Sequence, residues 1–130
     1  MKILLIDDDE SFQELFRRSL SIGPNIELKT VGLLEEGLLI ANDYDVCVVD
    51  LLLPDSGGAE ETITEVVSKI TKPSVIVSGI TDYNLSYILG KIRIGFIPKS
   101  ISPIALVMIL SNIIGFYEVS QEAYDILKKI

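Results

Sequence analysis

The chain has 130 residues, of which 48% are hydrophobic and 23% charged, and its formal net charge is −8. This length fits one domain with a substantial core. The negative charge disfavours direct binding to nucleic acid or to an anionic membrane, and the apolar stretches are short for a membrane span. The single cysteine, Cys47, cannot form an internal disulfide, and no signal peptide is visible, so we expect a cytoplasmic protein.

Five short apolar runs alternate with segments of helical periodicity. The runs, which predict strands, lie at residues 3–6, 26–30, 46–49, 75–77 and 92–96. Helices are predicted between them, within residues 12–20, 33–39, 63–70 and 82–89. A further helix is expected over 104–114, with Ser102 as its cap and Pro103 at its first position. A last helix is expected over about 121–129.

This alternation predicts an α/β fold with a parallel sheet that is covered by helices on both faces. The first, third and fourth runs are continuously apolar, which indicates strands buried on both sides. The second and fifth runs alternate with polar residues, as edge strands do. The flavodoxin-like doubly wound order 2-1-3-4-5 satisfies both patterns, and it places a ligand site beyond the carboxyl ends of strands one and three.

Unusual polar residues follow four of the predicted strands. Asp7 and Asp8 follow the first strand, Asp50 the third, Ser78 the fourth and Lys99 the fifth. The carboxyl ends of parallel strands share one edge, so these side chains should converge. Crowded carboxylates repel one another, and Mg²⁺ prefers oxygen ligands of this kind. We therefore predict a Mg²⁺ site at which Asp50 is a nucleophile for phosphoryl transfer, with Lys99 and Ser78 contacting the phosphoryl group.

At these residues the chain resembles the receiver domains of two-component response regulators. The matching blocks are LLIDDD at 4–9, VVDLLLPD at 48–55, VSG at 77–79 and GFIPKS at 95–100. All four occur in the family's order, and the resemblance covers about residues 1–117. It implies a phosphoacceptor domain rather than an enzyme acting on other substrates, because the domain catalyses only its own phosphorylation and dephosphorylation.

The resemblance also assigns roles to individual residues. Asp50 is implied as the phosphoacceptor for a histidine kinase or a histidine phosphotransfer protein. Asp8, Asp50 and the backbone carbonyl of Leu52 are implied Mg²⁺ ligands, with Asp7 acting mainly through water. Lys99 is implied to pair with the phosphoryl group.

Ser78 and Phe96 are the implied switch pair of the resemblance. Ser78 is expected to move toward the phosphoryl group, and Phe96 to turn into the vacated space. The surface of the fourth helix, fifth strand and fifth helix then reports the change to a partner.

Two segments are most similar to receivers that precede a LuxR-type helix-turn-helix. PKSISP at 98–103 lacks the proline that usually follows the lysine, so the usual cis peptide is in doubt. GFYEV at 115–119 is similar to that subfamily's linker. We expect a receiver domain over 1–117 and a linker or extra helix over 118–130. No helix-turn-helix follows within the chain, so transcription regulation would need a further domain.

Two further expectations concern lifetime and assembly. Leu52 and Ile80 flank the acceptor by the family's register, and both are apolar, so they should hinder the attacking water and slow the loss of phosphate. The predicted helix over 104–114 is apolar around most of its circumference, which favours a homodimer through the output surface.

Two other functions remain open from the sequence. DDDES at 7–11 fits the motif of haloacid-dehalogenase-like phosphatases, in which Asp7 would be the nucleophile. This alternative leaves Asp50 unexplained and lacks the acidic pair expected after Lys99. The other is a receiver-like interaction module that signals without phosphorylation.

Overall fold

The computed structural model describes residues 1–21, 26–79 and 94–102, and within the remainder of the chain residues 105, 108, 109, 112, 115, 122, 123 and 125–129. The chain forms two compact units, Met1–Ser100 and Ile101–Ile130. The boundary expected between residues 117 and 118 falls outside the described residues and stays a prediction.

The first unit contains five strands and three α-helices within its described residues. In chain order these are β1 (Lys2–Ile6), α1 (Glu10–Leu20), β2 (Glu27–Val31), α2 (Leu34–Ile40), β3 (Val46–Asp50), α3 (Ala59–Lys69), β4 (Ser74–Ser78) and β5 (Gly95–Pro98), with a short 3₁₀ helix at Ala41–Asp43 after α2. The helix expected over 82–89 lies outside the described residues.

The sheet is parallel throughout and has the order β2-β1-β3-β4-β5, which confirms the predicted flavodoxin-like, doubly wound topology. β3 is buried along its whole length, and β1 and β4 are buried except at their first residues. The strands predicted to lie at the edges, β2 and β5, are indeed the outer strands, and both are more exposed. The continuity of each apolar run therefore correctly predicted whether the strand lies inside the sheet or at its edge.

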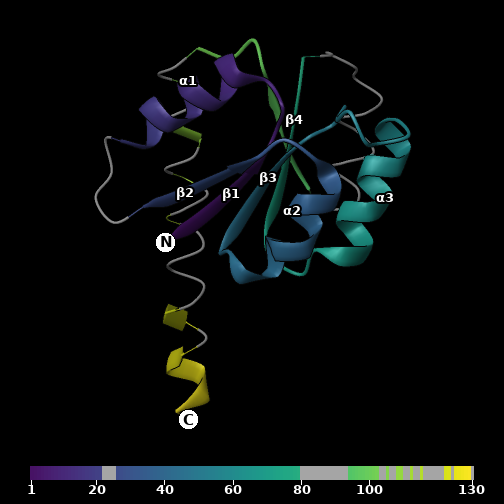
Figure 1. Cartoon of the computed structure of the whole chain (residues 1–130). Coiled ribbons are helices and arrows are strands. Elements are labelled where there is room, and N and C mark those ends of the chain that lie inside the picture. The colour runs from purple at the N-terminus through teal and green to yellow at the C-terminus, as the bar shows by residue number, and fades with distance from the viewer. Residues whose placement is uncertain are drawn as a thin grey trace. The chain divides into compact units, whose positions relative to one another are not determined.

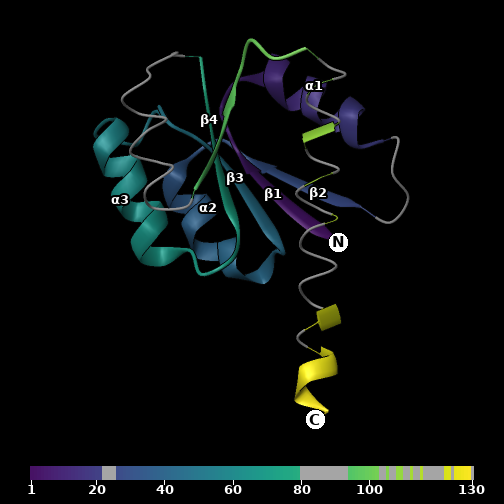
Figure 2. The ribbon, with the colours of Figure 1, turned by 180° about the vertical axis from the view of Figure 1, so that it is seen from behind.

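Helices cover both faces of the sheet, with α1 on one side and α2 and α3 on the other (Figures 1 and 2). Successive side chains of a strand point to opposite faces of the sheet, so each inner strand contributes residues to both layers. The layer beneath α2 and α3 is one cluster of buried residues: Leu4, Ile6, Leu34, Ala41, Cys47, Val49, Leu51, Leu53, Val66, Ile70 and Ile76. The intervening residues of β1 and β3 face the other side, where α1 buries Phe12, Phe16 and Leu20.

Local chemistry fixes where the helices begin and how closely they approach. Asp9 caps α1, because its Oδ1 accepts hydrogen bonds from the backbone N–H groups of Ser11 at 3.0 Å and Phe12 at 3.2 Å. Gly37 lets α2 lie directly on β1: a Cβ there would stand 2.2 Å from Cδ1 of Ile6. Gly58, which precedes α3, has a φ of 133°, a conformation that favours glycine.

β5 begins later than the pattern predicted. The expected run began at residue 92, which lies outside the described residues, whereas the strand starts at Gly95 and extends through Pro98. Proline has no N–H to donate, and an edge strand tolerates that loss. Among the described residues there is no cis peptide bond, and these include the bond after Lys99.

The second unit is described only at scattered positions. Residues 105, 108, 109, 112 and 115 are helical, as are 122, 123 and 125–128. Ser102 accepts a hydrogen bond from the backbone N–H of Ala105 at 3.2 Å, as expected for the cap of the predicted helix. No helix among the described residues is long and apolar enough to cross a membrane.

Candidate functional site

The polar residues predicted to converge lie at the carboxyl edge of the sheet. Asp7 directly follows β1, Asp50 ends β3, Ser78 ends β4 and Lys99 directly follows β5. The register explains the alignment, because β1, β3, β4 and β5 pair in parallel up to these residues. Two backbone hydrogen bonds extend the strand pairing just past the strand ends: Leu51 N–H donates to Val77 O at 3.0 Å, and Lys99 N–H donates to Ser78 O at 2.8 Å.

Lys99 and three carboxylates form an acidic pocket at this edge. Oxygens of Asp7, Asp8 and Asp50 all lie within 4.8 Å of one another. The Nζ atom of Lys99 lies 2.9 Å from Oδ2 of Asp7 and 3.1 Å from Oδ2 of Asp50. Asp7 and Asp50 are buried, whereas Asp8 is exposed at the rim. The Lys99 ammonium therefore contacts both Asp7 and Asp50, which are 43 positions apart in the chain, and Lys99 itself lies in a third segment far from both.

Burial and charge perturb the ionisation of the acidic pocket. Burial raises the pKa of Asp50 to about 6; the charge of Asp7 adds to this shift, while Lys99 opposes it. For Lys99, burial alone would lower the pKa, but its hydrogen bond to Asp7 and the charges of both carboxylates raise it above its ordinary value. The ammonium therefore stays charged, and the carboxylates together still exceed its single charge.

The donor set of the acidic pocket suits a hard divalent cation. Oδ2 of Asp7 is buried and, although it faces the Lys99 ammonium, it accepts no hydrogen bond from any described residue. Oδ1 of the same residue accepts from the backbone N–H of Asp9 at 2.8 Å. An incompletely satisfied buried carboxylate oxygen beside two other carboxylates is the environment that an oxygen-seeking ion relieves.

The remaining predicted site residues lie around the pocket. Ser78 is buried at the end of β4, next to the strand that carries Asp50. Phe96, on β5, is partly buried against the cluster beneath α2 and α3 and pairs in register with Ile76. Leu52 is 48% exposed, and its backbone N–H donates to Oδ1 of Asp50 at 3.4 Å. Ile80 lies outside the described residues.

Sequence reasoning missed three residues that support the pocket from α1 and from its capping residue. Asp9 Oδ2 lies 3.8 Å from Lys99 Nζ, and the ammonium stands 5.2 Å from the centroid of the Phe12 ring. The side-chain amide of Gln13 donates to the backbone carbonyl of Asp7 at 2.5 Å. Asp9 had a local signal, because an aspartate before an apolar helix is a capping residue. Phe12 and Gln13 had none, since their contacts depend on where α1 crosses the sheet edge.

The chain is similar in sequence to known response regulators over part of its length. No family model matches the chain. The cell cycle response regulator CtrA of Brucella ovis is 36% identical over 81 residues, which is 61% of this chain and 34% of that protein. The chain thus spans about a third of the length of the curated relatives it matches.

Solved structures show the same fold. A signal receiver domain from Vibrio parahaemolyticus superposes with a TM-score of 0.81 at 17% identity, covering 94% of this chain and 95% of that one. The Mn²⁺-bound form of response regulator Rcp1 gives a TM-score of 0.67 at 19% identity, covering 89% and 93%. At such identities the likeness establishes architecture rather than activity. The chain therefore has the fold of response-regulator receiver domains.

Proposed function

We propose that this chain is a phosphoacceptor receiver domain that takes a phosphoryl group onto Asp50 from a phosphohistidine. The observation that carries the proposal is the contact of one ammonium, that of Lys99, with both Asp7 and Asp50 inside a group of three carboxylates. A carboxylate nucleophile, a cation for the phosphoryl oxygens and oxygen ligands for a metal meet there.

The transfer exchanges one bond to phosphorus for another. A carboxylate oxygen of Asp50 bonds to phosphorus while the bond from phosphorus to the partner's histidine nitrogen breaks, and the imidazole leaves with the bonding pair. Lys99 balances the charge that arrives on Asp50, as a point cation within contact distance. The domain would promote only this reaction and the later hydrolysis of its own acyl phosphate.

Asp7, Asp8, Asp50 and the backbone carbonyl of Leu52 would hold Mg²⁺. When bound, the ion supplies positive charge for the crowded carboxylate and phosphoryl oxygens. The exposed Asp8 and half-exposed Leu52 leave the pocket open to solvent on one side, as a site for a transferred group requires. The Mn²⁺-bound neighbour supports a divalent ion in this fold.

Ser78 and Phe96 would form the switch, and the surface of the fourth helix, β5 and the fifth helix would be the output. The partners would be a sensor histidine kinase or a phosphotransfer protein in the cytoplasm. Similarity to the cell cycle response regulator CtrA supports a role in signalling. The resemblance of 98–103 and 115–119 to receivers of the LuxR-type subfamily favours transcription regulation through a further domain as the output. The net charge of −8 argues against direct nucleic-acid binding by this segment.

Labelling with a small phosphodonor tests the proposal. The chain is incubated with acetyl phosphate and Mg²⁺, and the modified aspartate is located by peptide mass mapping. We expect modification at Asp50 and none in Asp50→Asn. The matched control, Asp43→Asn, changes an exposed acid in the 3₁₀ helix before β3 and should remain labelled.

The same experiment separates the two rival functions. Labelling at Asp7 would favour a haloacid-dehalogenase-like phosphatase. No labelling, together with no thermal shift on adding beryllofluoride and Mg²⁺, would favour an interaction module that works without phosphorylation. Either result overturns the proposal.

A further inference from the structure

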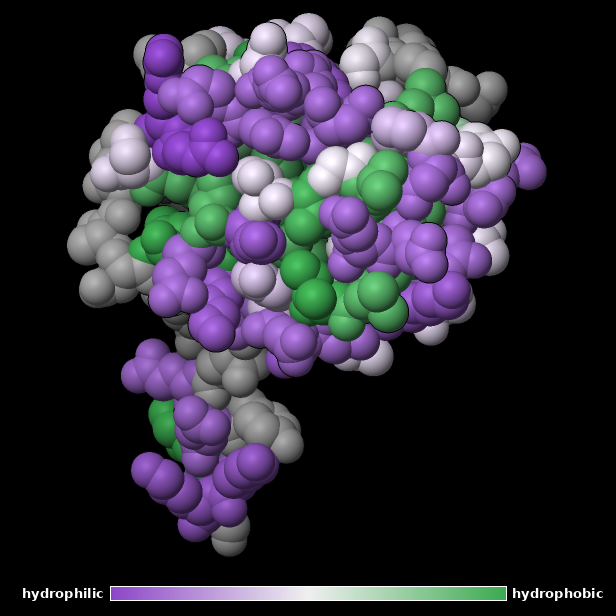
Figure 3. All heavy atoms as spheres, in the orientation of Figure 1, coloured by the Kyte–Doolittle hydropathy of each residue, from purple (hydrophilic) through white to green (hydrophobic). Residues whose placement is uncertain are grey.

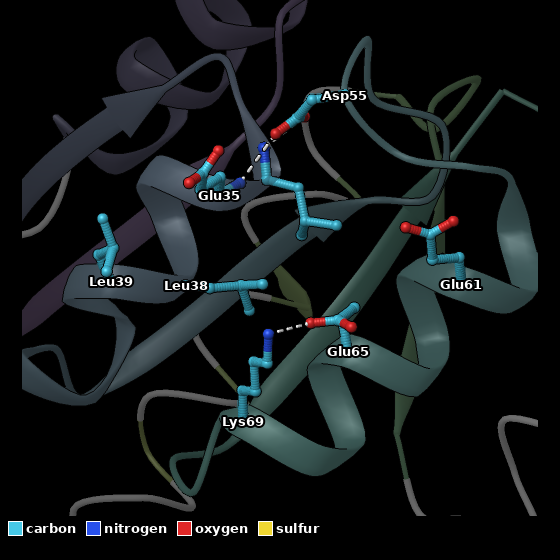
Figure 4. A pocket seen from close by; sticks show the side chains of 8 residues that line it. Glu35, Leu38, Leu39, Asp55, Glu61, Glu65 and Lys69 are labelled. Atoms are coloured by element: carbon cyan, nitrogen blue, oxygen red, sulfur yellow. Dashed lines mark hydrogen bonds and ion pairs between the residues drawn. The ribbon is translucent and has the colours of Figure 1, made fainter.

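A groove runs between α2 and α3, on the sheet face opposite α1 (Figure 4). Its volume is about 460 Å³, within the range of cavities that bind ligands. The lining residues are Leu34, Glu35, Leu38, Leu39, Asp55, Glu61, Glu65 and Lys69. The acidic pocket contributes none of them, so the groove is a separate feature of the molecule.

The α2 side of the groove is aliphatic. Leu34 is 4% exposed and forms part of the core, Leu38 is partly buried, and Leu39 is 80% exposed. Leu38 points toward α3, whereas Leu39 lies at the outer margin (Figure 4). On the surface this face carries hydrophobic patches bordered by hydrophilic side chains (Figure 3). An exposed leucine beside a partly buried one offers apolar area that a partner can cover.

The rest of the groove is acidic. Four of its side chains are acids and one is a base, which gives the lining a net charge of −3. Lys69 is already engaged, since its Nζ lies 2.6 Å from Glu65. The carboxylates of Glu35 and Glu61 make no hydrogen bond or ion pair with any described residue. Two negative charges, one on each wall, thus face the groove without a counter-charge.

We propose that this groove binds a cationic amphipathic helix of a partner protein, with an aliphatic side chain between Leu38 and α3 and Lys or Arg side chains at Glu35 and Glu61. This is helix-in-groove recognition, in which apolar contact gives affinity and rim charges give specificity. Nucleic acid and anionic lipid would be repelled by the acidic rim. A second copy of this chain is disfavoured too, because it carries a net charge of −8.

The test uses two synthetic amphipathic helices that share one leucine face and differ only in carrying lysine or glutamate on the other face. Each is titrated into the full chain while backbone amides are followed by NMR. We expect the lysine peptide to shift amides of α2 and α3, and the glutamate peptide to shift none. The double variant Glu35→Lys with Glu61→Lys should bind the lysine peptide at least about tenfold more weakly than the wild type does. It should bind the glutamate peptide more tightly than the wild type does.

The matched control carries the same charge change elsewhere, as Glu27→Lys with Glu122→Lys; both residues are exposed and neither lines the groove. It should bind the lysine peptide as the wild type does. Equal weakening in the control would reveal attraction by net charge alone and would overturn the proposal. Shifts outside α2 and α3, no binding at millimolar peptide, or groove shifts that grow with protein concentration alone would also overturn it. Labelling of Asp50 is independent of all these outcomes.

Discussion

Asp8 differs from the other two carboxylates of the acidic pocket because it is exposed. Its main role in the proposed site is therefore as a metal ligand rather than in packing. We expect saturating Mg²⁺ to stabilise the wild type by about 1–3 kcal/mol, as measured by thermal unfolding with and without EDTA. Asp8→Ala should lose this increment while unfolding normally in EDTA. Asp43→Ala, another exposed acid, should keep it, and a full Mg²⁺ response in Asp8→Ala would contradict the assignment.

Phe12 connects α1 to the acidic pocket. Its buried ring lies 5.2 Å from the Lys99 ammonium, and such contacts contribute about 0.5–1 kcal/mol. We expect Phe12→Leu to slow labelling by acetyl phosphate several-fold, because the ammonium loses the surface that positions it. Phe16→Leu is the matched control: Phe16 is also buried, its ring lies 6.1 Å from that of Phe12, and it makes no cation–π contact with Lys99 among the described residues. Equal slowing in both variants would indicate loss of packing alone.

Leu52 lies beside Asp50, the proposed phosphoacceptor, and has an apolar side chain that is 48% exposed. It offers no group to orient an attacking water, so the acyl phosphate of the wild type should be long-lived. We expect Leu52→Asn to speed the loss of phosphate by about tenfold, which corresponds to 1.4 kcal/mol of barrier. The decay of phosphoprotein after removal of phosphodonor measures this. Leu39→Asn should decay as the wild type does, and wild-type hydrolysis within seconds would refute the idea.

Among the helices, α2 is unusual in how it begins. Its preceding residue, Leu33, provides no side-chain cap, and Asp55 supplies one from the loop after β3 instead. The Asp55 carboxylate accepts from the backbone N–H groups of Leu34 at 2.8 Å and Glu35 at 2.9 Å. Slight burial opposes the shift, but these hydrogen bonds lower the pKa of Asp55 below its ordinary value. The loop that follows Asp50 is thereby tied to α2.

We expect Asp55→Ala to lower the free energy of unfolding by about 1 kcal/mol at neutral pH, the usual effect of losing a helix cap. A lowered pKa in the folded state means that the stabilisation is present above the ordinary value near pH 4 and lost as pH falls through the lowered pKa. The difference between variant and wild type in urea unfolding should therefore shrink between pH 7 and pH 3. A difference that stays constant with pH would exclude the charged cap.

The sequence predicted those features that depend on residues close together in the chain. Continuous apolar runs predicted β1, β3 and β4. Asp7 and Asp50 could be predicted as site residues because they are polar and stand at the ends of such runs. The site followed because parallel strands bring their carboxyl ends to one edge. The cap from Asp55 to α2 and the contact of Phe12 with Lys99 could not be predicted. Each joins segments far apart in the chain, and neither leaves a periodic or spacing signal.

For the entire chain, charge and apolar surface act against each other. The net charge of −8 opposes the approach of two copies, while exposed hydrophobic side chains favour it. Met108, in the helix expected over 104–114, is 62% exposed. Salt at about 0.5 M shortens the Debye length well below 10 Å, so it weakens the repulsion but not apolar contact. An apolar dimer should therefore strengthen with salt, whereas one held by ion pairs would weaken.

We predict that the domain treated with beryllofluoride and Mg²⁺ forms a homodimer at high micromolar concentration, and that this dimer is tighter at about 0.5 M salt than at about 0.05 M. Sedimentation velocity measures both. Met108→Lys should remain monomeric, because it places a charge at an exposed apolar position of the helix proposed to belong to the output surface. Leu39→Lys is the matched control: it makes the same kind of change at an exposed aliphatic residue on α2 and should dimerise as the wild type does. A strictly monomeric wild type under these conditions would rule out the dimer, and dimerisation weakened by salt would show that ion pairs rather than apolar contacts hold it.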